Sequence, residues 1–450
     1  MREFDVVVIG AGAAGEVAAG RLGENGVSVA IVEQALVGGD CSFYACMPSK
    51  ALLRPVELVN EVRRVPGLTV SPIDTAAVLK RRDEVIHDRD DSTQVPWLEK
   101  RGVTLIRGRA RIAGELQVDV EGQESLVARK AVVVATGSTA LIPDIPGLRA
   151  TKPWTNKEAT TSSTVPPRLA ILGGGVVGVE MAQAWGALGS AVTLIHRGPR
   201  LIVREEPFAS EQVLASLREL RVDVRLETAA KRVARAGAFS LELDDDTTVE
   251  AEQVLVAVGR KAGTEGIGLE AFGIATDRPL EVGDDLRVPG HDWLYAVGDV
   301  NGRVQLTHMG KYQGRLVADS ILGRKAELRS DGGRSPRVIF TDPQVGAVGL
   351  TLAAAQEAGI RVRHVDAETG GNAGGSFIGH GAPGTARLVI DEQRRVIVGA
   401  TITGAEIAEA LHAATIAVVC EVSLDDLWHA VPSFPTRSEL WLRLLEAYGL

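Results

Sequence analysis

Two segments of the chain begin alike, and this repetition constrains the fold more than any other feature. In residues 4–33 and again in residues 168–196, an apolar run leads into a glycine-rich turn, an alanine-rich stretch and a second apolar run. Short apolar runs bounded by glycines predict buried strands, and the alanine-rich stretches between them predict helices. Each segment is therefore interpreted as a strand, turn, helix and strand unit, with which a dinucleotide-binding module begins. We expect an α/β fold with two Rossmann-like nucleotide-binding domains.

The rest of the chain is organised around these two units. Helices are predicted over residues 48–64 and 76–100, and strands over 103–112, 131–135, 253–258 and 293–297. The last three strands each end near a glycine, which suggests a first domain that is interrupted by the second and then resumes. Residues 330–335, composed of Gly, Ser, Asp and Arg, predict a linker before a last α+β domain. The expected divisions are 1–150, 151–262, 263–326 and 334–450.

Composition excludes several classes of function. The 450 residues carry a formal net charge of -9 without a basic run, so nucleic acid and anionic membrane are not expected as partners. No segment has the length and apolarity of a membrane helix, and no signal peptide is recognised. Three cysteines cannot form a secreted disulfide framework. The compartment is therefore expected to be cytoplasmic, with reactive or buried thiols.

The first glycine-rich turn has the spacing of a phosphate-binding turn. Gly10, Gly12 and Gly15 follow a predicted strand and open a predicted helix, and Glu33 ends the next strand. Glycines at these places permit a tight turn and a close approach of the backbone to a pyrophosphate, while the helix N-terminus attracts negative charge. Glu33 is placed to accept hydrogen bonds from an adenosine ribose. The alternative is a turn with a purely structural role.

The second turn, with Gly173, Gly175 and Gly178, differs in the residue that ends the following strand. This residue is His196 instead of an acid, and Arg197, Arg200 and Arg204 follow it. A missing carboxylate removes the repulsion of a ribose 2'-phosphate, and arginine offers planar donors to that phosphate. The pattern favours NADPH over NADH. Alternatively, the arginines are solvated residues of a loop.

Cys41 and Cys46 form a candidate redox pair in the sequence GGDCSFYACMPSK, residues 38–50. Five residues of ideal helix would separate their α-carbons by roughly 8 to 9 Å, beyond the limit of about 7 Å for a disulfide. A bridge therefore needs a locally distorted helix, and a strained bridge suits a catalytic dithiol because it is easily reduced. From the spacing alone, two buried small apolar side chains are an equal alternative.

The whole chain resembles the pyridine nucleotide-disulfide oxidoreductase family of lipoamide dehydrogenase, glutathione reductase and mercuric reductase. The resemblance rests on the GGxCxxxxCxPSK signature, both glycine-rich turns, the strand ending at Gly137 and the pair Gly298-Asp299, in the family's order. It implies FAD-binding segments 1–150 and 263–326, an NAD(P)H-binding segment 151–262 and a dimerisation domain 334–450. A homodimer follows from the resemblance alone.

The resemblance also implies roles for individual residues. Cys46 would be the charge-transfer thiol beside the flavin, Cys41 the interchange thiol that meets substrate, and Lys50 would pair with Glu180 near flavin N5. The other residues that it implies are cofactor contacts: Gly10, Gly12, Gly15, Glu33, Gly137, Gly259, Gly298 and Asp299 for FAD, and Gly173, Gly175, Gly178, Arg197 and Arg204 for NADPH.

The chain departs from the family in the stretch that normally reads HPTxxE. Phe434 stands in place of the histidine that acts as acid and base in the partner subunit's site, and a phenyl ring cannot transfer a proton. His429 is a weak candidate to replace it, and residues Thr436–Glu439 fit a capping box for the last helix. Cys420, after an apolar run, is expected to be a packed core residue.

These observations predict an enzyme that passes electrons from NADPH through FAD to Cys41 and Cys46. The expected acceptor is a small-molecule disulfide, a low-pKa thiol or a soft metal ion, because none of these needs a strong proton donor for its leaving group. One alternative is a diaphorase or quinone reductase that uses the flavin directly. The other is a redox-sensing flavoprotein with little turnover.

Overall fold

The first of two compact units consists of residues 1–48, 83–141 and 260–332. The structure is a computed structural model that describes residues 1–382 and 384–450. The centre of this unit is a sheet in which parallel strands lie in the order β3-β2-β1-β6, with β16 also parallel to β6 and an antiparallel extension through β5 and β4. The strands of this sheet are β1 (Arg2–Ile9), β2 (Val29–Glu33), β3 (Val103–Arg107), β4 (Ala110–Gly114), β5 (Gln117–Val120), β6 (Leu126–Val134) and β16 (Leu294–Ala296). Two further strands, β7 (Ser138–Ala140) and β15 (Arg260–Ala262), pair with each other in a separate antiparallel sheet.

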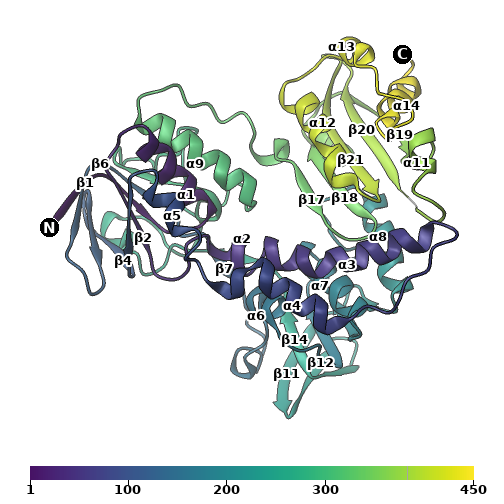
Figure 1. Cartoon of the computed structure of the whole chain (residues 1–450), viewed down its shortest axis with the longest axis horizontal. Coiled ribbons are helices and arrows are strands. Elements are labelled where there is room, and N and C mark those ends of the chain that lie inside the picture. The colour runs from purple at the N-terminus through teal and green to yellow at the C-terminus, as the bar shows by residue number, and fades with distance from the viewer. Residues whose placement is uncertain (383) are drawn as a thin grey trace. The chain divides into compact units, whose positions relative to one another are not determined.

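The central strands of the sheet are parallel because helices connect them and cover their apolar side chains. Val6, Val7 and Val8 of β1 are fully buried, as expected for a central strand covered on both faces. Helices α1 and α9 pack against each other beside this sheet (Figure 1). The helices are α1 (Ala13–Glu24), α2 (Gly39–Phe43), α5 (Val95–Glu99) and α9 (Thr307–Ile321), with short 3-10 turns at His87–Arg89, Leu269–Phe272 and Gly298–Asn301.

The second unit consists of residues 49–82, 142–259 and 333–450. It contains a parallel sheet in the order β10-β9-β8-β14 and an antiparallel three-stranded sheet, β11-β12-β13. Their strands are β8 (Arg168–Leu172), β9 (Ala191–Ile195), β10 (Asp223–Arg225), β11 (Ala230–Ala236), β12 (Ala238–Leu243), β13 (Thr248–Ala251) and β14 (Gln253–Val256). The helices of this part are α6 (Asn156–Thr161), α7 (Val176–Ala187) and α8 (Pro207–Glu219), with a 3-10 turn at Arg149–Thr151.

The C-terminal part of the second unit has an antiparallel five-stranded sheet, β17-β18-β21-β20-β19. Helix α12 lies against β18 and β21, and α14 lies against β19 and β20 (Figure 1). The elements are β17 (Arg337–Ile339), β18 (Gln344–Gly349), α10 (Leu352–Glu357), β19 (Val362–Glu368), α11 (Ala373–Ser376), β20 (Thr385–Asp391), β21 (Val396–Gly404), α12 (Ile407–Val419), α13 (Leu424–His429) and α14 (Glu439–Tyr448), preceded by a 3-10 turn at Gly332–Arg334. The α/β fold class expected from the sequence is confirmed.

Two helices connect the units along the chain, α3 (Cys46–Arg64) and α4 (Thr75–Val85). The prediction of one helix over residues 76–100 was wrong. His87, Asp88 and Arg89 have positive φ angles, and the side chain of Asp90 accepts the backbone N–H of Ser92. This local hydrogen bond competes with helix formation, so the helix ends at Val85 and a short one, α5, begins at Val95.

Two further local predictions were wrong. The strand expected over residues 103–112 is divided into β3 and β4 at Gly108, whose φ is 148°. The capping box expected at Thr436 does not form, because α14 begins after Ser438 without a side-chain cap, and the Thr436 hydroxyl donates to the Ser433 carbonyl instead. The sequence pattern predicted that the Thr436 hydroxyl would accept the first N–H groups of α14. It instead closes a turn that precedes the helix.

Candidate functional site

The two glycine-rich turns share one geometry, and the space around the Cβ position differs from one glycine of the turn to the next. Gly10 has φ 103°, and a Cβ there would lie 2.5 Å from the Ala135 carbonyl oxygen. A Cβ on Gly15 would lie 1.9 Å from the Gly10 oxygen, so helix α1 can meet the turn only without one. At Gly12, the residue before α1, there is nothing within 4 Å of a Cβ position. This open space at a helix N-terminus fits the pyrophosphate of a dinucleotide.

The second turn repeats these relations in the other unit. Gly173 has φ 114° and a Cβ position 2.3 Å from the Ala257 oxygen, while a Cβ on Gly178 would lie 1.9 Å from the Gly173 oxygen. Gly175, the residue before α7, again has open space around its Cβ position. Both turns therefore have the geometry that the phosphates of a dinucleotide require.

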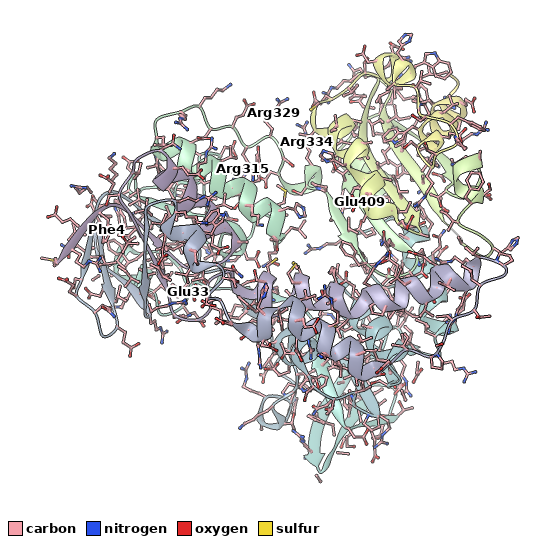
Figure 2. All side chains as sticks on the ribbon, viewed as in Figure 1. Phe4, Glu33, Arg315, Arg329, Arg334 and Glu409 are labelled. Carbon is pink, nitrogen blue, oxygen red and sulfur yellow. The ribbon has the colours of Figure 1, made fainter. Side chains whose placement is uncertain are left out.

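Glu33 ends β2 beside the first turn (Figure 2). Its two carboxylate oxygens accept the backbone N–H groups of Ala11 and Ala35, each at 2.7 Å. A carboxylate oxygen has more than one lone pair, so both can also accept a ribose hydroxyl. The Glu33 side chain therefore holds the glycine turn and can bind a ribose hydroxyl at the same time.

The three arginines of the loop after β9 are of two kinds, one that bonds the loop backbone and two that are exposed to solvent. Arg200 donates to the carbonyls of Val203 and Glu205, so its guanidinium closes the loop. Arg197 and Arg204 have exposed side chains that can reach a ligand. His196 accepts the Gly174 N–H through Nδ1 at 3.2 Å, and burial lowers its pKa. The neutral ring thus ties the glycine turn to the base of the arginine loop.

The two cysteines lie at a break between helices. Cys41 is in α2, which ends at Phe43, and Cys46 begins α3, so the ideal helix that would keep the thiols apart is interrupted as expected. A hydrogen bond with Cys46 raises the pKa of the Cys41 thiol well above its usual range, with burial and the charge of Cys46 acting in the same direction. The Cys46 sulfur lies 3.3 Å from the hydroxyl oxygen of Thr307 at the start of α9. The thiols are close enough to interact directly.

An arginine holds the start of the cysteine segment. Arg260 donates to Asp40 at 2.8 Å and, through Nε, to the Ser138 hydroxyl at 2.6 Å. Ser138 in turn donates to Asp299 at 2.5 Å. The residue before Cys41, the strand after Gly137 and the Gly298-Asp299 pair are thereby joined in one polar network. Gly137 and Gly298 have φ angles of 68° and 78°, which favour glycine.

Lys50 and Glu180 form an ion pair in the second unit. The Lys50 ammonium lies 2.8 Å from Glu180 Oε2 and 4.7 Å from the centre of the Phe340 ring. Glu180, whose side chain is 4 % exposed, also accepts the Phe340 backbone N–H at 2.9 Å. Phe340, the residue after β17, thus holds the pair through its backbone N–H and its ring. Gly259, also in this unit, has φ 141° and open space at its Cβ position.

The segment that contains the exposed ring of Phe434 is anchored three residues further on, by Arg437. Phe434 is 76 % exposed, and Arg437 donates to Glu406 and to the Ala405 carbonyl. His429 ends α13. Cys420 is exposed at the end of α12, so the prediction that it is a packed core residue was wrong. The helix before Cys420 buries only one of its faces against the core, and Cys420, at the end of this helix, is not on that face.

Sequence reasoning did not assign the residues that surround the thiols. Thr307 contacts Cys46 from 261 positions away, and Asp40 and Arg260 are separated by 220. Contacts between such distant residues depend on the fold. The only sequence signal for them was that these residues lie near the family's motifs.

Within residues 1–382 and 384–450, no three His, Cys, Asp or Glu side chains form a group that could hold a metal ion. No helix of these residues is long and apolar enough to cross a membrane.

The comparisons with known proteins agree with this arrangement. Residues 4–314 match the family model described as pyridine nucleotide-disulphide oxidoreductase, and residues 335–444 match the dimerisation domain of the same group. The chain is 32% identical to a mercuric reductase of Staphylococcus aureus, over 97% of this chain and 81% of that protein. It is 31% identical to a dihydrolipoyl dehydrogenase of Haloferax volcanii, over 98% and 95% of the two chains.

Solved structures show the same fold at lower identity. The flavoprotein disulfide reductase RclA from Escherichia coli, in its Cu(II) complex, superposes with a TM-score of 0.87 at 23% identity and 99% coverage of both chains. LpdA from Mycobacterium tuberculosis gives a TM-score of 0.88 at 22% identity, with 100% of both chains covered. The matched family models, together with this fold, define the class of protein as a flavin-dependent oxidoreductase with two dinucleotide-binding domains.

The chain belongs to the pyridine nucleotide-disulfide oxidoreductase family. It is therefore an enzyme of a family that uses FAD and a pyridine nucleotide, and its matched dimerisation domain supports a homodimer.

Proposed function

We propose that this protein oxidises NADPH and passes the electrons, by way of FAD, to the Cys41–Cys46 pair and then to a small acceptor. The observation that carries the proposal is the direct interaction of the two thiols at the junction of α2 and α3, in the unit that contains the first glycine turn. When bound, FAD supplies hydride acceptance from the nicotinamide and two electrons for the disulfide form of the pair.

The chain's own residues have distinct parts in this reaction. Gly10, Gly12, Gly15, Glu33, Gly137, Gly259, Gly298 and Asp299 would hold FAD, and Gly173, Gly175, Gly178, Arg197 and Arg204 would hold NADPH. Lys50, fixed by Glu180, would place a positive charge near flavin N5. Cys46, beside Thr307, would be the thiol next to the flavin, and Cys41 would be the thiol that meets the acceptor.

The preference for NADPH rests on the loop after β9. Its first residue is the neutral His196, and the exposed side chains of Arg197 and Arg204 are available to bind a 2'-phosphate. Arg200 is committed to loop carbonyls. We expect two of the three arginines to discriminate between the coenzymes.

The acceptor is expected to need little help from a proton donor, because Phe434 stands where the family's histidine is expected. In the oxidative half-reaction, the Cys41 thiolate attacks one sulfur of an acceptor disulfide and expels the other as a thiolate. Cys46 then attacks Cys41, which restores the pair and releases the second thiolate. A leaving group of low pKa departs without protonation. The 32% identity to a mercuric reductase makes a soft metal ion the second class of acceptor to test.

We also propose the division into FAD-binding segments 1–150 and 263–326, an NAD(P)H-binding segment 151–262 and a dimerisation domain 334–450. A cytoplasmic location belongs to the same proposal, because a reducing compartment suits a dithiol that must be reduced in each cycle.

The test is anaerobic stopped-flow reduction of the holoenzyme with NADPH, followed by turnover with disulfide, Hg²⁺ and quinone acceptors. In the wild type, a long-wavelength absorbance should persist after two electrons have been taken up. C41S should lose turnover of disulfides, while C420S is the control that removes an exposed thiol elsewhere. If C41S keeps disulfide turnover, or the wild type with full FAD content never develops that absorbance, the relay is wrong and direct electron transfer to a quinone is favoured.

A further inference from the structure

One face of α9 continues from the thiol contact to a lysine. Thr307 is the first residue of α9, and its hydroxyl oxygen lies 3.3 Å from the Cys46 sulfur. Lys311 follows four residues later, and residues four apart lie on the same face of a helix with Cβ atoms about 5–6 Å apart. The exposed Lys311 side chain therefore starts one helical turn from the residue that contacts the redox pair.

Helix α1 brings an acid to the same place. Gly314 lets α9 approach α1 closely, since a Cβ there would lie 2.6 Å from the Ala14 carbonyl oxygen. Glu16, two residues after Ala14, is in the first turn of α1. Burial raises the pKa of Glu16 to about 7, the positive charge of Lys311 opposes this rise, and Glu33 adds to it. The Lys311 ammonium thus lies within electrostatic range of the Glu16 carboxyl group.

The same ammonium acts on the thiols. The pKa of Cys41 is raised by the hydrogen bond with Cys46 and by burial, while Thr307 and the charge of Lys311 lower it. Lys311 therefore lies within range of both Glu16 and Cys41, and all of these residues belong to the first unit.

We propose that Lys311 stabilises the thiolate of the reduced Cys41–Cys46 pair, and that ionised Glu16 weakens this stabilisation. The proposal rests on the proposed function, because it assumes a pair that is reduced during turnover. It explains how an enzyme with Phe434 in place of a base can present a nucleophilic sulfur, since a fixed positive charge favours the thiolate without accepting a proton.

The direction of the pH dependence follows from the charges. Below about pH 7 Glu16 is neutral, and Lys311 acts on the thiols with its full charge. Above that pH the carboxylate offsets part of this charge, so thiolate formation requires a higher pH than it otherwise would. The charged groups that act on Glu16 are Lys311 from α9 and Glu33 from β2, while Gln94, before α5, can donate a neutral amide N–H to it at 3.3 Å.

The experiment measures the pH profile of thiol alkylation in the reduced holoenzyme. A C420S background restricts alkylation to the pair, and the rate with iodoacetamide is followed by mass at Cys41. An opposite charge within about 4–6 Å shifts a pKa by about one to three units, and solvent screening of an exposed charge such as Lys311 places the expected shift at the lower end of this range. K311M should therefore move the midpoint up by about one pH unit, which is about a tenfold slower rate below the midpoint. K311R should restore the midpoint, and E16Q should move it down.

The control is R315M, which removes the positive charge of Arg315 one further turn along α9 (Arg315 is labelled in Figure 2). The Arg315 guanidinium lies 5.9 Å from the centre of the Tyr312 ring. Its profile should match the wild type. The inference is overturned if K311M and R315M have the same midpoint, or if E16Q moves it in the same direction as K311M. If K311M does not retain FAD, the E16Q and K311R profiles decide the matter, since a downward shift and an unchanged midpoint are both required. The proposed function fails separately, through the absence of long-wavelength absorbance in the wild type.

Discussion

Alanine substitutions in the second glycine turn should separate stability from coenzyme binding. An alanine Cβ at position 178 would lie 1.9 Å from the Gly173 oxygen, whereas real Cβ atoms do not come within 3.0 Å. About 1.1 Å must be gained by moving α7 away from the turn, and overpacking of this kind typically costs about 1–3 kcal/mol. G178A should therefore lower the free energy of unfolding by an amount in this range.

An alanine at position 175 should leave stability nearly unchanged and weaken coenzyme binding. Gly175 has φ -81°, which alanine adopts without strain, and nothing lies within 4 Å of its Cβ position. The free energy of unfolding should change by less than about 0.5 kcal/mol. The added methyl group would occupy the space where the backbone meets the pyrophosphate, so the KM for NADPH should rise at least about tenfold, corresponding to about 1.4 kcal/mol.

The assays are thermal or denaturant unfolding, FAD content by absorbance, and the KM for NADPH in the same preparations. Both variants should retain FAD, since the second turn is not in the unit that contains the first. A G175A protein that binds NADPH as tightly as the wild type, or a G178A protein of unchanged stability, would refute the reasoning from open and filled Cβ positions.

Three further changes test other parts of the site. K50M leaves the buried Glu180 carboxylate with the Phe340 N–H and should destabilise the protein by about 3 kcal/mol, most of which K50M/E180M should recover in denaturant titrations. R204A should raise the KM for NADPH more than that for NADH, whereas R200A should lower the melting temperature; equal effects of both on the two KM values would contradict the division of the arginines. F434H should raise kcat/KM for unactivated disulfides by about tenfold or more in steady-state assays, and an unchanged value would mean that proton transfer is not limiting.

The parts of the fold that the sequence predicted are those with local determinants. The strand, glycine turn and helix at Gly10, and their counterpart at Gly173, depend on apolar runs, on φ angles that only glycine tolerates and on close contacts within a short segment. The polar helix over residues 76–100 failed because the Asp90 carboxylate captures a backbone N–H that a continuous helix would need. The sequence feature that could have shown this is Asp90 itself, because short polar side chains favour caps and turns over helix interiors.

The site was predicted less completely than the fold for a related reason. The cysteine pair and the glycines carry local signatures, but the groups that act on the thiols come from distant segments. Thr307 contacts Cys46, and Lys311 acts on Cys41 through its charge, from a helix α9 that packs on α1 at Gly310 and Gly314. The sequence places Lys311 near the start of this helix, but it does not show which side chains Lys311 faces until the packing of α9 is known.

The junction of α2 and α3 makes the two thiols inequivalent, and this has a consequence for catalysis. Cys46 begins a helix of 19 residues, so its sulfur lies at the positive end of the helix dipole and beside the Thr307 hydroxyl. Cys41 lies within a short helix, and its neighbour's hydrogen bond and charge raise its pKa. A single negative charge on the reduced pair is therefore expected mainly on Cys46. In the proposed function no histidine takes a proton from Cys41. The reactivity of that thiol should then depend on the Lys311 charge, and acceptors with poor leaving groups should react slowly.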